Sequence, residues 1–282
     1  MTRLQNKANA EALQGSMSRN DGGVKLPFAA PILWWKNANT ELAGMDEITD
    51  VRRFGGWGIS KDDIDEQKDQ LPPELPANWK LFETLRNHDG GTYAAYLTRQ
   101  VWVAPIDRRY VWKTYDGKAR SKVNILCYMA VGTPDKKLLP WGAVVLSGSS
   151  YSGKAIDDAI AKFKTDTDKL RDGDPVNLFY IPLGTFGNAP IFDKYTGKEG
   201  KSSSTTPCQL FTPEGGYTAQ TLDDWFVGDE VAAEMGLLRA QAGEWLDEWN
   251  KKKDDKQDDV PTGANDVAGY PDGDGMPDFM KD

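Results

Sequence analysis

The residues closest to a catalytic motif lie between Gly148 and Ala155, in the stretch GSSYSGKA. They follow an apolar stretch, open a predicted helix and fit the spacing G-x-x-x-x-G-K of a phosphate-binding loop. Ala155 stands where a hydroxyl would bind Mg²⁺, and no later apolar stretch ends in an aspartate. Phosphoryl transfer depends on that metal for charge stabilisation. The stretch therefore predicts a Gly/Ser turn at a helix N-terminus or a phosphate contact through Lys154, and a nucleotide-binding enzyme with a degenerate loop remains an alternative.

The histidine, the cysteines and the acidic residues do not form a recognisable catalytic or metal-binding motif. His88, in RNHDGG, is the single histidine, so a histidine-based triad would have to use it. One histidine and two distant cysteines, Cys127 and Cys208, do not predict a zinc site. The stretch DGDGMPD resembles the calcium loops of thrombospondin type 3 repeats, but Tyr270 replaces the first acid and the oxygens are too few. We therefore expect no enzyme activity, no catalytic residue, no metal and no cofactor.

Basic and aromatic residues interleave in the middle of the chain. Between positions 92 and 150 nine bases oppose three acids, a balance of +6, although the whole chain carries −9. Single-stranded nucleic acid is held by rings that stack on bases, at about 1–3 kcal/mol each, and by cations that follow the phosphates. Alternatively, the rings are core and the bases form a solvated face. The predicted nucleic-acid-binding residues are Trp35, Arg99, Trp102, Arg108, Arg109, Tyr110, Trp112, Lys113, Tyr115, Lys118, Arg120, Lys122 and Lys154.

The patterning around these residues predicts an α+β fold. Residues 26–36, with two prolines, predict an edge strand, and 37–76 predict loops with one short helix. Strands are expected over 92–106, on both sides of an Asp116-Gly117 hairpin turn, and over 139–147, 176–184 and 206–212. Apolar spacing predicts helices over 154–171 and 227–253. This order is typical of an OB-like antiparallel β-barrel with one inserted helix and a C-terminal helix.

The length and composition allow one large domain with polar extensions. We expect a disordered arm over 1–23, the OB-like domain over 24–253 and an acidic disordered tail over 254–282. No apolar stretch is long enough to span a bilayer or to act as a secretory signal. The two cysteines are therefore expected to be reduced, in a cytoplasmic protein without membrane contact.

The tail has nine acids and two bases, a balance of −7. It resembles the acidic termini of bacterial and phage single-stranded DNA-binding proteins, whose Asp/Pro/Phe tip docks partner proteins. The comparable residues are Asp272, Asp274, Pro277, Asp278 and Phe279, although three residues follow the phenylalanine that is normally terminal in that family. The resemblance implies binding of replication or recombination proteins. A chain of this length spans about 30 Å r.m.s., so the tail could also compete with DNA for a basic groove; the alternative is a solubilising tail.

A looser similarity to uncharacterised phage and prophage proteins rests on Leu26 to Asn37 and Gly142 to Phe163. The sequence as a whole predicts a non-enzymatic single-stranded DNA-binding protein that accompanies replication or recombination. A virion or assembly protein is the second hypothesis. Homo-oligomerisation and the choice between DNA and RNA are left open.

Overall fold

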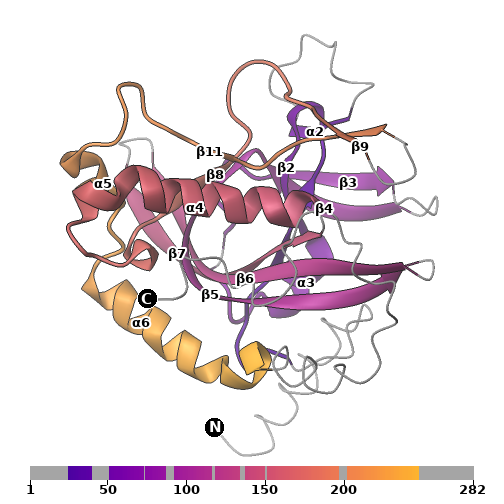
Figure 1. Ribbon diagram of the computed structural model, residues 1–282. Helices are drawn as coiled ribbons and strands as arrows, with labels where there is room; N and C mark the ends of the chain where they lie inside the picture. Colours follow the sequence, from indigo (N-terminus) through magenta and orange to yellow (C-terminus); the bar gives the residue numbers. More distant parts are fainter. Residues whose placement is uncertain are drawn as a thin grey trace, which may run out of the picture.

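One nine-stranded sheet organises the part of the chain that the structure, a computed structural model, describes (Figure 1). The structure describes residues 25–39, 51–72, 74–86, 92–115, 118–133, 137–149, 151–196 and 202–247. Within these ranges it describes only the backbone of residues 86, 111–115, 118–121, 194–196 and 202–204. The arm and the tail expected at 1–23 and 254–282 lie outside these ranges.

The strands are β1 (Ile32–Lys36), β2 (Gly56–Ser60), β3 (Lys80–Arg86), β4 (Thr92–Thr98), β5 (Gln100–Tyr115), β6 (Lys118–Gly132), β7 (Leu138–Ser149), β8 (Ile181–Gly184) and β11 (Gln209–Leu210). They pair in the order β11-β8-β5-β6-β7-β1-β2-β4-β3, and every pair except β1–β7 is antiparallel. The sheet is strongly curled and forms a half-barrel (Figure 1). A separate hairpin joins β9 (Asp193–Thr196) to β10 (Ser202–Thr205).

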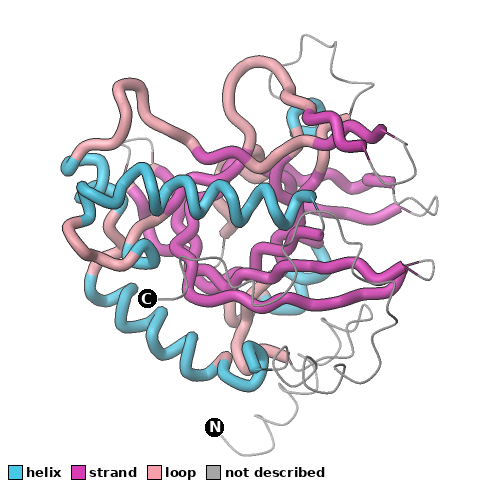
Figure 2. The backbone as a smooth tube through the Cα atoms, in the orientation of Figure 1, coloured by secondary structure: helices cyan, strands magenta, loops and turns pink. Residues whose placement is uncertain are grey.

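The helices are α2 (Val51–Phe54), α3 (Lys61–Gln67), α4 (Tyr151–Arg171), α5 (Ala219–Trp225) and α6 (Asp229–Gln241), with a 3₁₀ turn over Val176–Leu178. Helix α4 lies across one side of the curled sheet and α6 runs along another side of the molecule (Figures 1 and 2). Residues 243–247 continue in helical conformation after α6.

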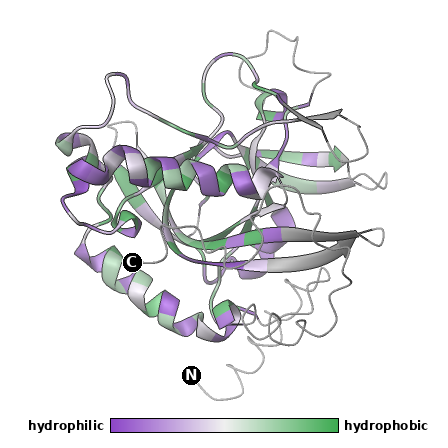
Figure 3. Cartoon of the chain, in the orientation of Figure 1, coloured by the Kyte–Doolittle hydropathy of each residue, from purple (hydrophilic) through white to green (hydrophobic). Residues whose placement is uncertain are grey.

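Both faces of the central strands are covered, which explains why these strands are rich in apolar residues (Figure 3). On one face, Ile156, Ile160 and Phe163 of α4 pack with residues of β5–β8 and with α5. On the other face, α6 and residues 26–32 pack with the alternate residues of β5, β6 and β7. A smaller cluster joins α2 to β3 and β4.

The structure corrects one prediction. The stretch before Lys36 is not an edge strand, because β1 lies between β7 and β2. Its two prolines, Pro27 and Pro31, precede the strand and so remove no ladder hydrogen bond from it. The sheet also contains β2 and β3, which were not predicted. The coarse α+β class is confirmed, and the OB-like barrel stays a prediction.

The predicted helix over 154–171 is confirmed as α4, and its first turn packs tightly against the end of β7. A Cβ atom on Gly148 would lie 2.8 Å from the Cα atom of Gly153, and one on Gly153 would lie 2.9 Å from the Gly148 carbonyl oxygen. Only glycine at both positions permits this approach. It brings Phe163, nearly three turns further on, into ring contact with Tyr217 and Trp225.

Truncating Phe163 tests this packing. Its side chain is fully buried, so Phe163→Ala should lower the free energy of unfolding by about 3–5 kcal/mol. Urea denaturation measures the change, with Leu170→Ala on the same helix as control, because Leu170 is exposed. A similar small loss in both variants would show that α4 does not pack on the sheet as described.

Candidate nucleic-acid interface

The long hairpin of β5 and β6 contains most of the predicted binding residues, and it reaches the edge of the molecule (Figure 1). Its strands pair from Trp102 with Ala130 to Tyr115 with Lys118, so the pairing confirms the predicted hairpin up to the residues that flank its turn. The turn residues, Asp116 and Gly117, lie outside the described residues.

The register of β5 against β6 shows on which face of the hairpin each charged position lies. Tyr110 packs against the core beneath α4, whereas Arg109 packs on the α6 side. Because side chains alternate between faces and paired residues share a face, the positions on the α6 side can be read from the pairing. They are Arg109, Lys113, Tyr115, Lys118, Arg120 and Lys122, while Trp112 falls at a position on the α4 side. Five basic positions therefore share one face of the hairpin.

Arg109, at the end of this face that is farther from the turn, contacts Trp245 in the C-terminal part of the described chain. Its guanidinium carbon lies 4.0 Å from the centroid of the Trp245 ring, and its Nη1 donates a hydrogen bond to the Trp245 carbonyl oxygen at 3.1 Å. Burial and the charge of Arg109 lower the pKa of Lys122. The two cations are thus close enough to repel each other.

Arg108 faces the other way, which corrects its prediction as a phosphate contact. Its Nη1 lies 2.8 Å from Oδ1 of Asp157 on α4, and the two side chains are 6% and 10% exposed. The Tyr110 hydroxyl donates to the second carboxylate oxygen at 3.4 Å. Burial raises the pKa of Asp157 against the opposing effect of Arg108. Arg108 and Tyr110 therefore hold the hairpin to α4.

Two predicted stacking rings are also engaged inside the protein. The indole N–H of Trp35 donates to the Thr206 carbonyl oxygen at 2.8 Å, and its ring meets Trp57 edge to face at 5.0 Å. Trp102 is partly buried and meets Trp225 in the same way at 5.0 Å. These contacts engage both rings inside the protein, so they give no support to base stacking. Trp112 and Tyr115 are the predicted rings whose side chains lie outside the description.

The stretch Gly148–Lys154 does not form a phosphate loop. Strand β7 ends at Ser149 and α4 begins at Tyr151, which leaves no room for the wide loop that encircles a phosphate. The Ser149 N–H donates to the Ser152 hydroxyl at 3.2 Å, and Gly153 is buried against Gly148. Lys154 is exposed and pairs with Asp158 at 2.5 Å. The geometry thus favours the predicted turn over the nucleotide-binding alternative.

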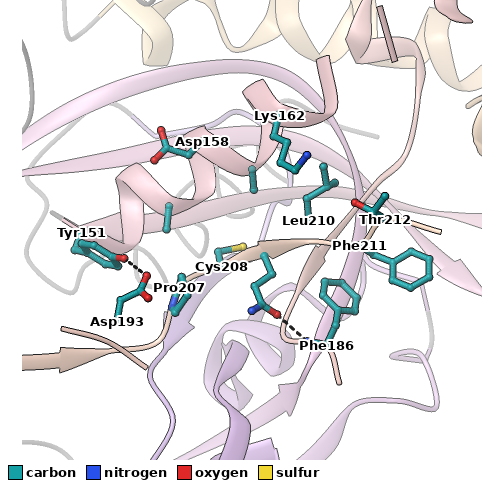
Figure 4. Close-up of a pocket in the computed structure, with 13 residues that line it drawn as sticks. Tyr151, Asp158, Lys162, Phe186, Asp193, Pro207, Cys208, Leu210, Phe211 and Thr212 are labelled. Carbon is teal, nitrogen blue, oxygen red and sulfur yellow. Dashed lines mark hydrogen bonds between the residues drawn. The ribbon is translucent and has the colours of Figure 1, made fainter. Parts of the chain in front are cut away.

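A cleft of about 620 Å³ lies beside α4, between that helix and the segments around 186–193 and 207–212 (Figure 4). At one end the Tyr151 hydroxyl donates to the Asp193 carboxylate, and burial together with this contact raises the pKa of Tyr151 to about 12. At the other end the rings of Phe186 and Phe211 lie 5.3 Å apart. The cleft was not predicted, because its lining comes from segments that only the fold brings together.

A second group of bases that was not predicted from the sequence lies around α2 and the strand ends beside it. It consists of Lys36, Arg52 and Arg53 together with the predicted Arg99. The dipeptide Arg52-Arg53 was a visible signal, but it stood outside the basic middle of the chain. Its link to Arg99 depends on the pairing of β2 with β4, which sequence patterning did not reveal.

Comparison with protein-family models finds no match, and comparisons with curated proteins and with solved structures find no significant similarity. No described helix is long and apolar enough to cross a membrane. Within the described ranges, no three His, Cys, Asp or Glu side chains are grouped to hold a metal ion. Both cysteines are buried free thiols, and burial raises the pKa of each. The predicted partner-binding residues Asp272, Asp274, Pro277, Asp278 and Phe279 lie outside the described residues.

Two arginines test whether Arg108 has an internal role. Replacing Arg108 by Met leaves a buried carboxylate without its cation, so Arg108→Met should reduce the free energy of unfolding by about 3–5 kcal/mol. Arg239→Met is the matched control, because Arg239 is exposed and pairs with Asp107 at 2.8 Å; it should cost less than about 1 kcal/mol. Urea denaturation of both variants gives the comparison. Equal small losses would return Arg108 to the set of candidate phosphate contacts.

Proposed function

We propose that the protein binds single-stranded DNA through the basic face of the β5–β6 hairpin. The observation that supports this most directly is the register, which gives Lys113, Lys118, Arg120 and Lys122 positions on one face. Positive charge repeated along a two-stranded ribbon matches the repeated phosphates of a polynucleotide better than it matches a single small anion.

The electrostatics of the hairpin base support the same proposal. Burial and Arg109 lower the pKa of Lys122, so the free protein bears a cost for keeping both groups charged. A phosphate beside them favours the charged form of the lysine and offsets part of that cost. Binding that arises in this way weakens as salt rises, because counterions then compete for the phosphates.

The curled sheet also supports a more specific proposal, namely that the protein binds single strands in the manner of OB-type proteins. A concave antiparallel sheet with a helix inserted after β7 is the setting in which OB-type proteins hold single strands. We further propose that the protein acts in the cytoplasm, without catalysis, as an accessory of replication or recombination, of the phage type that the sequence resemblance implies. Base stacking in this proposal rests on Tyr115, whose position is on the same face as the bases; Trp112 is at a position on the opposite face.

Charge removal on the hairpin tests the proposal. The triple variant Lys113→Gln/Lys118→Gln/Arg120→Gln should weaken binding of a labelled oligodeoxythymidine by about tenfold or more at 50 mM salt. The slope of log affinity against log salt should decrease by about 2, since each lost phosphate contact contributes about 0.7 for single strands. Fluorescence anisotropy at several salt concentrations measures both quantities.

The control for that variant is Lys68→Gln/Lys169→Gln, which removes two charges from exposed positions at the C-terminal end of α3 and on α4. It should bind like the wild type. Absence of binding by the wild-type protein at 50 mM salt would refute the proposed function. An unchanged salt slope in the triple variant would show that the DNA binds elsewhere.

Removing residues 254–282 tests the acidic tail. If the tail competes with DNA for the basic face, the truncated protein should bind the oligonucleotide more tightly, because a nearby polyanion no longer occupies the cations. The gain should shrink as salt rises. Weaker binding after truncation would contradict competition between the tail and DNA.

A further inference from the structure

Four bases lie at one corner of the sheet. Arg53 and Arg99 approach the ring of Phe54, Arg52 lies over the ring of Phe82, and Lys36 is close enough to Arg52 to feel its charge. Lys36 ends β1, Arg52 and Arg53 belong to α2, and Arg99 joins β4 to β5. The guanidinium carbons of Arg99 and Arg53 lie 3.9 and 5.1 Å from the centroid of the buried Phe54 ring. These two carbons are therefore at most about 9 Å apart.

Three of these bases, Lys36, Arg53 and Arg99, are not paired with a described carboxylate. Arg53 has two buried nitrogens, Nε and Nη1, that have no hydrogen-bond partner. Burial and the charge of Arg52 lower the pKa of Lys36, and burial lowers the pKa of Arg99. Grouped, partly desolvated cations of this kind are costly unless an anion joins them.

The corner has structural support that holds it in place. Arg99 donates from Nη2 to the Gly187 carbonyl oxygen at 2.8 Å and from Nε to the Thr185 hydroxyl at 3.4 Å. The Thr185 hydroxyl in turn donates to the Gly55 carbonyl oxygen at 3.0 Å. The segment that follows β8 thus fixes Arg99 beside α2, so the ligand does not have to order this side chain.

The same segment leads directly into the aromatic end of the cleft. Phe186 lies between Thr185 and Gly187, both of which Arg99 contacts, and its ring is paired with the exposed ring of Phe211 (Figure 4). The cations and the rings therefore adjoin across three consecutive residues. A ligand with a phosphate and a flat ring, which is the chemistry of a nucleotide, matches both.

We propose that Lys36, Arg53 and Arg99 form a phosphate-binding site that takes the phosphate of a nucleotide unit. The site is distinct from the β5–β6 hairpin and does not depend on the proposed function. Its phosphate can belong to a free nucleotide or to a nucleic-acid strand, and the experiment separates these sources.

The test compares the wild type with Lys36→Gln/Arg53→Gln, which leaves the supporting contacts of Arg99 intact. The control is again Lys68→Gln/Lys169→Gln, which loses the same number of charges. Thermal unfolding is followed with tripolyphosphate and with thymidine monophosphate. Both probes should raise the melting temperature of the wild type and of the control by several degrees at saturating concentration, and of the corner variant by much less. Because Lys36→Gln removes the repulsion between Lys36 and Arg52, the ligand-free variant should melt no lower than the wild type.

Stabilisation that is equal in all three proteins, or absent from the wild type, would overturn the inference. A larger effect of the nucleotide than of tripolyphosphate on the wild type supports the contact with Phe186 and Phe211. An oligonucleotide arm identifies the source of the phosphate: weaker oligonucleotide binding by the corner variant assigns it to a nucleic-acid strand, and unchanged binding assigns it to a free nucleotide.

The outcomes also keep the two proposals apart. If the wild type binds no oligonucleotide but is stabilised by nucleotide through Lys36 and Arg53, the proposed function fails and the phosphate site stands. If the hairpin variant loses oligonucleotide binding while no probe acts through the corner, the proposed function stands and the phosphate site fails.

Discussion

The packing of α4 on the curled sheet is the contact on which the rest of the structure depends. Gly148 and Gly153 let the helix start almost in contact with the end of β7. From there α4 places Phe163 against α5 and Asp157 against Arg108 of the hairpin. One helix therefore joins the end of β7, the base of the long hairpin and the segment that follows β8. Without it the apolar residues of β5–β8 on that face would be open to water.

This packing divides the basic residues into two groups with different roles. Arg108 and Arg109 lie at the hairpin base, where one pairs with a buried carboxylate and the other stacks on Trp245. Their charges stabilise the attachment of the hairpin to the helices on either side. Lys113, Lys118 and Arg120 occupy positions nearer the turn, beyond these contacts. A positive balance in the sequence is thus a poor measure of binding surface, because part of the charge is structural.

Sequence patterning predicted those elements whose signals are local. The Asp-Gly turn between two β-rich stretches predicted the hairpin, and apolar spacing predicted α4 to within three residues at its start. The apolar residues at helical spacing in this stretch include Ile156, Ile160 and Phe163, which are buried, and Leu170, which is exposed. The terminal helix was placed correctly but begins at Asp229, and the helix α5 before it was missed.

Non-local features could not be predicted in the same way. The central place of β1 depends on its parallel pairing with β7, more than a hundred residues later, and nothing in the residues 32–36 specifies that partner. Trp35 and Trp102 were candidate ligand rings because large aromatic residues look alike in sequence whether they pack or bind. The contacts with Trp57 and Trp225 show that both rings pack inside the protein. These contacts arise only from the pairing of strands and the position of α5. The cleft and the cationic corner have the same origin.

The position of the corner relative to the hairpin constrains how one strand of nucleic acid could use both. Arg99 immediately precedes β5, and the basic positions of the hairpin lie toward the other end of that strand. Sixteen extended residues span at most about 50 Å, and the curl of the sheet shortens this path. At about 3.4 Å per stacked nucleotide, a strand would need roughly 15 nucleotides to reach from one site to the other, and fewer if its bases are unstacked. Short oligonucleotides can therefore occupy only one site, and joint occupation by a longer strand would increase its affinity without any new contact, because the second binding step becomes intramolecular.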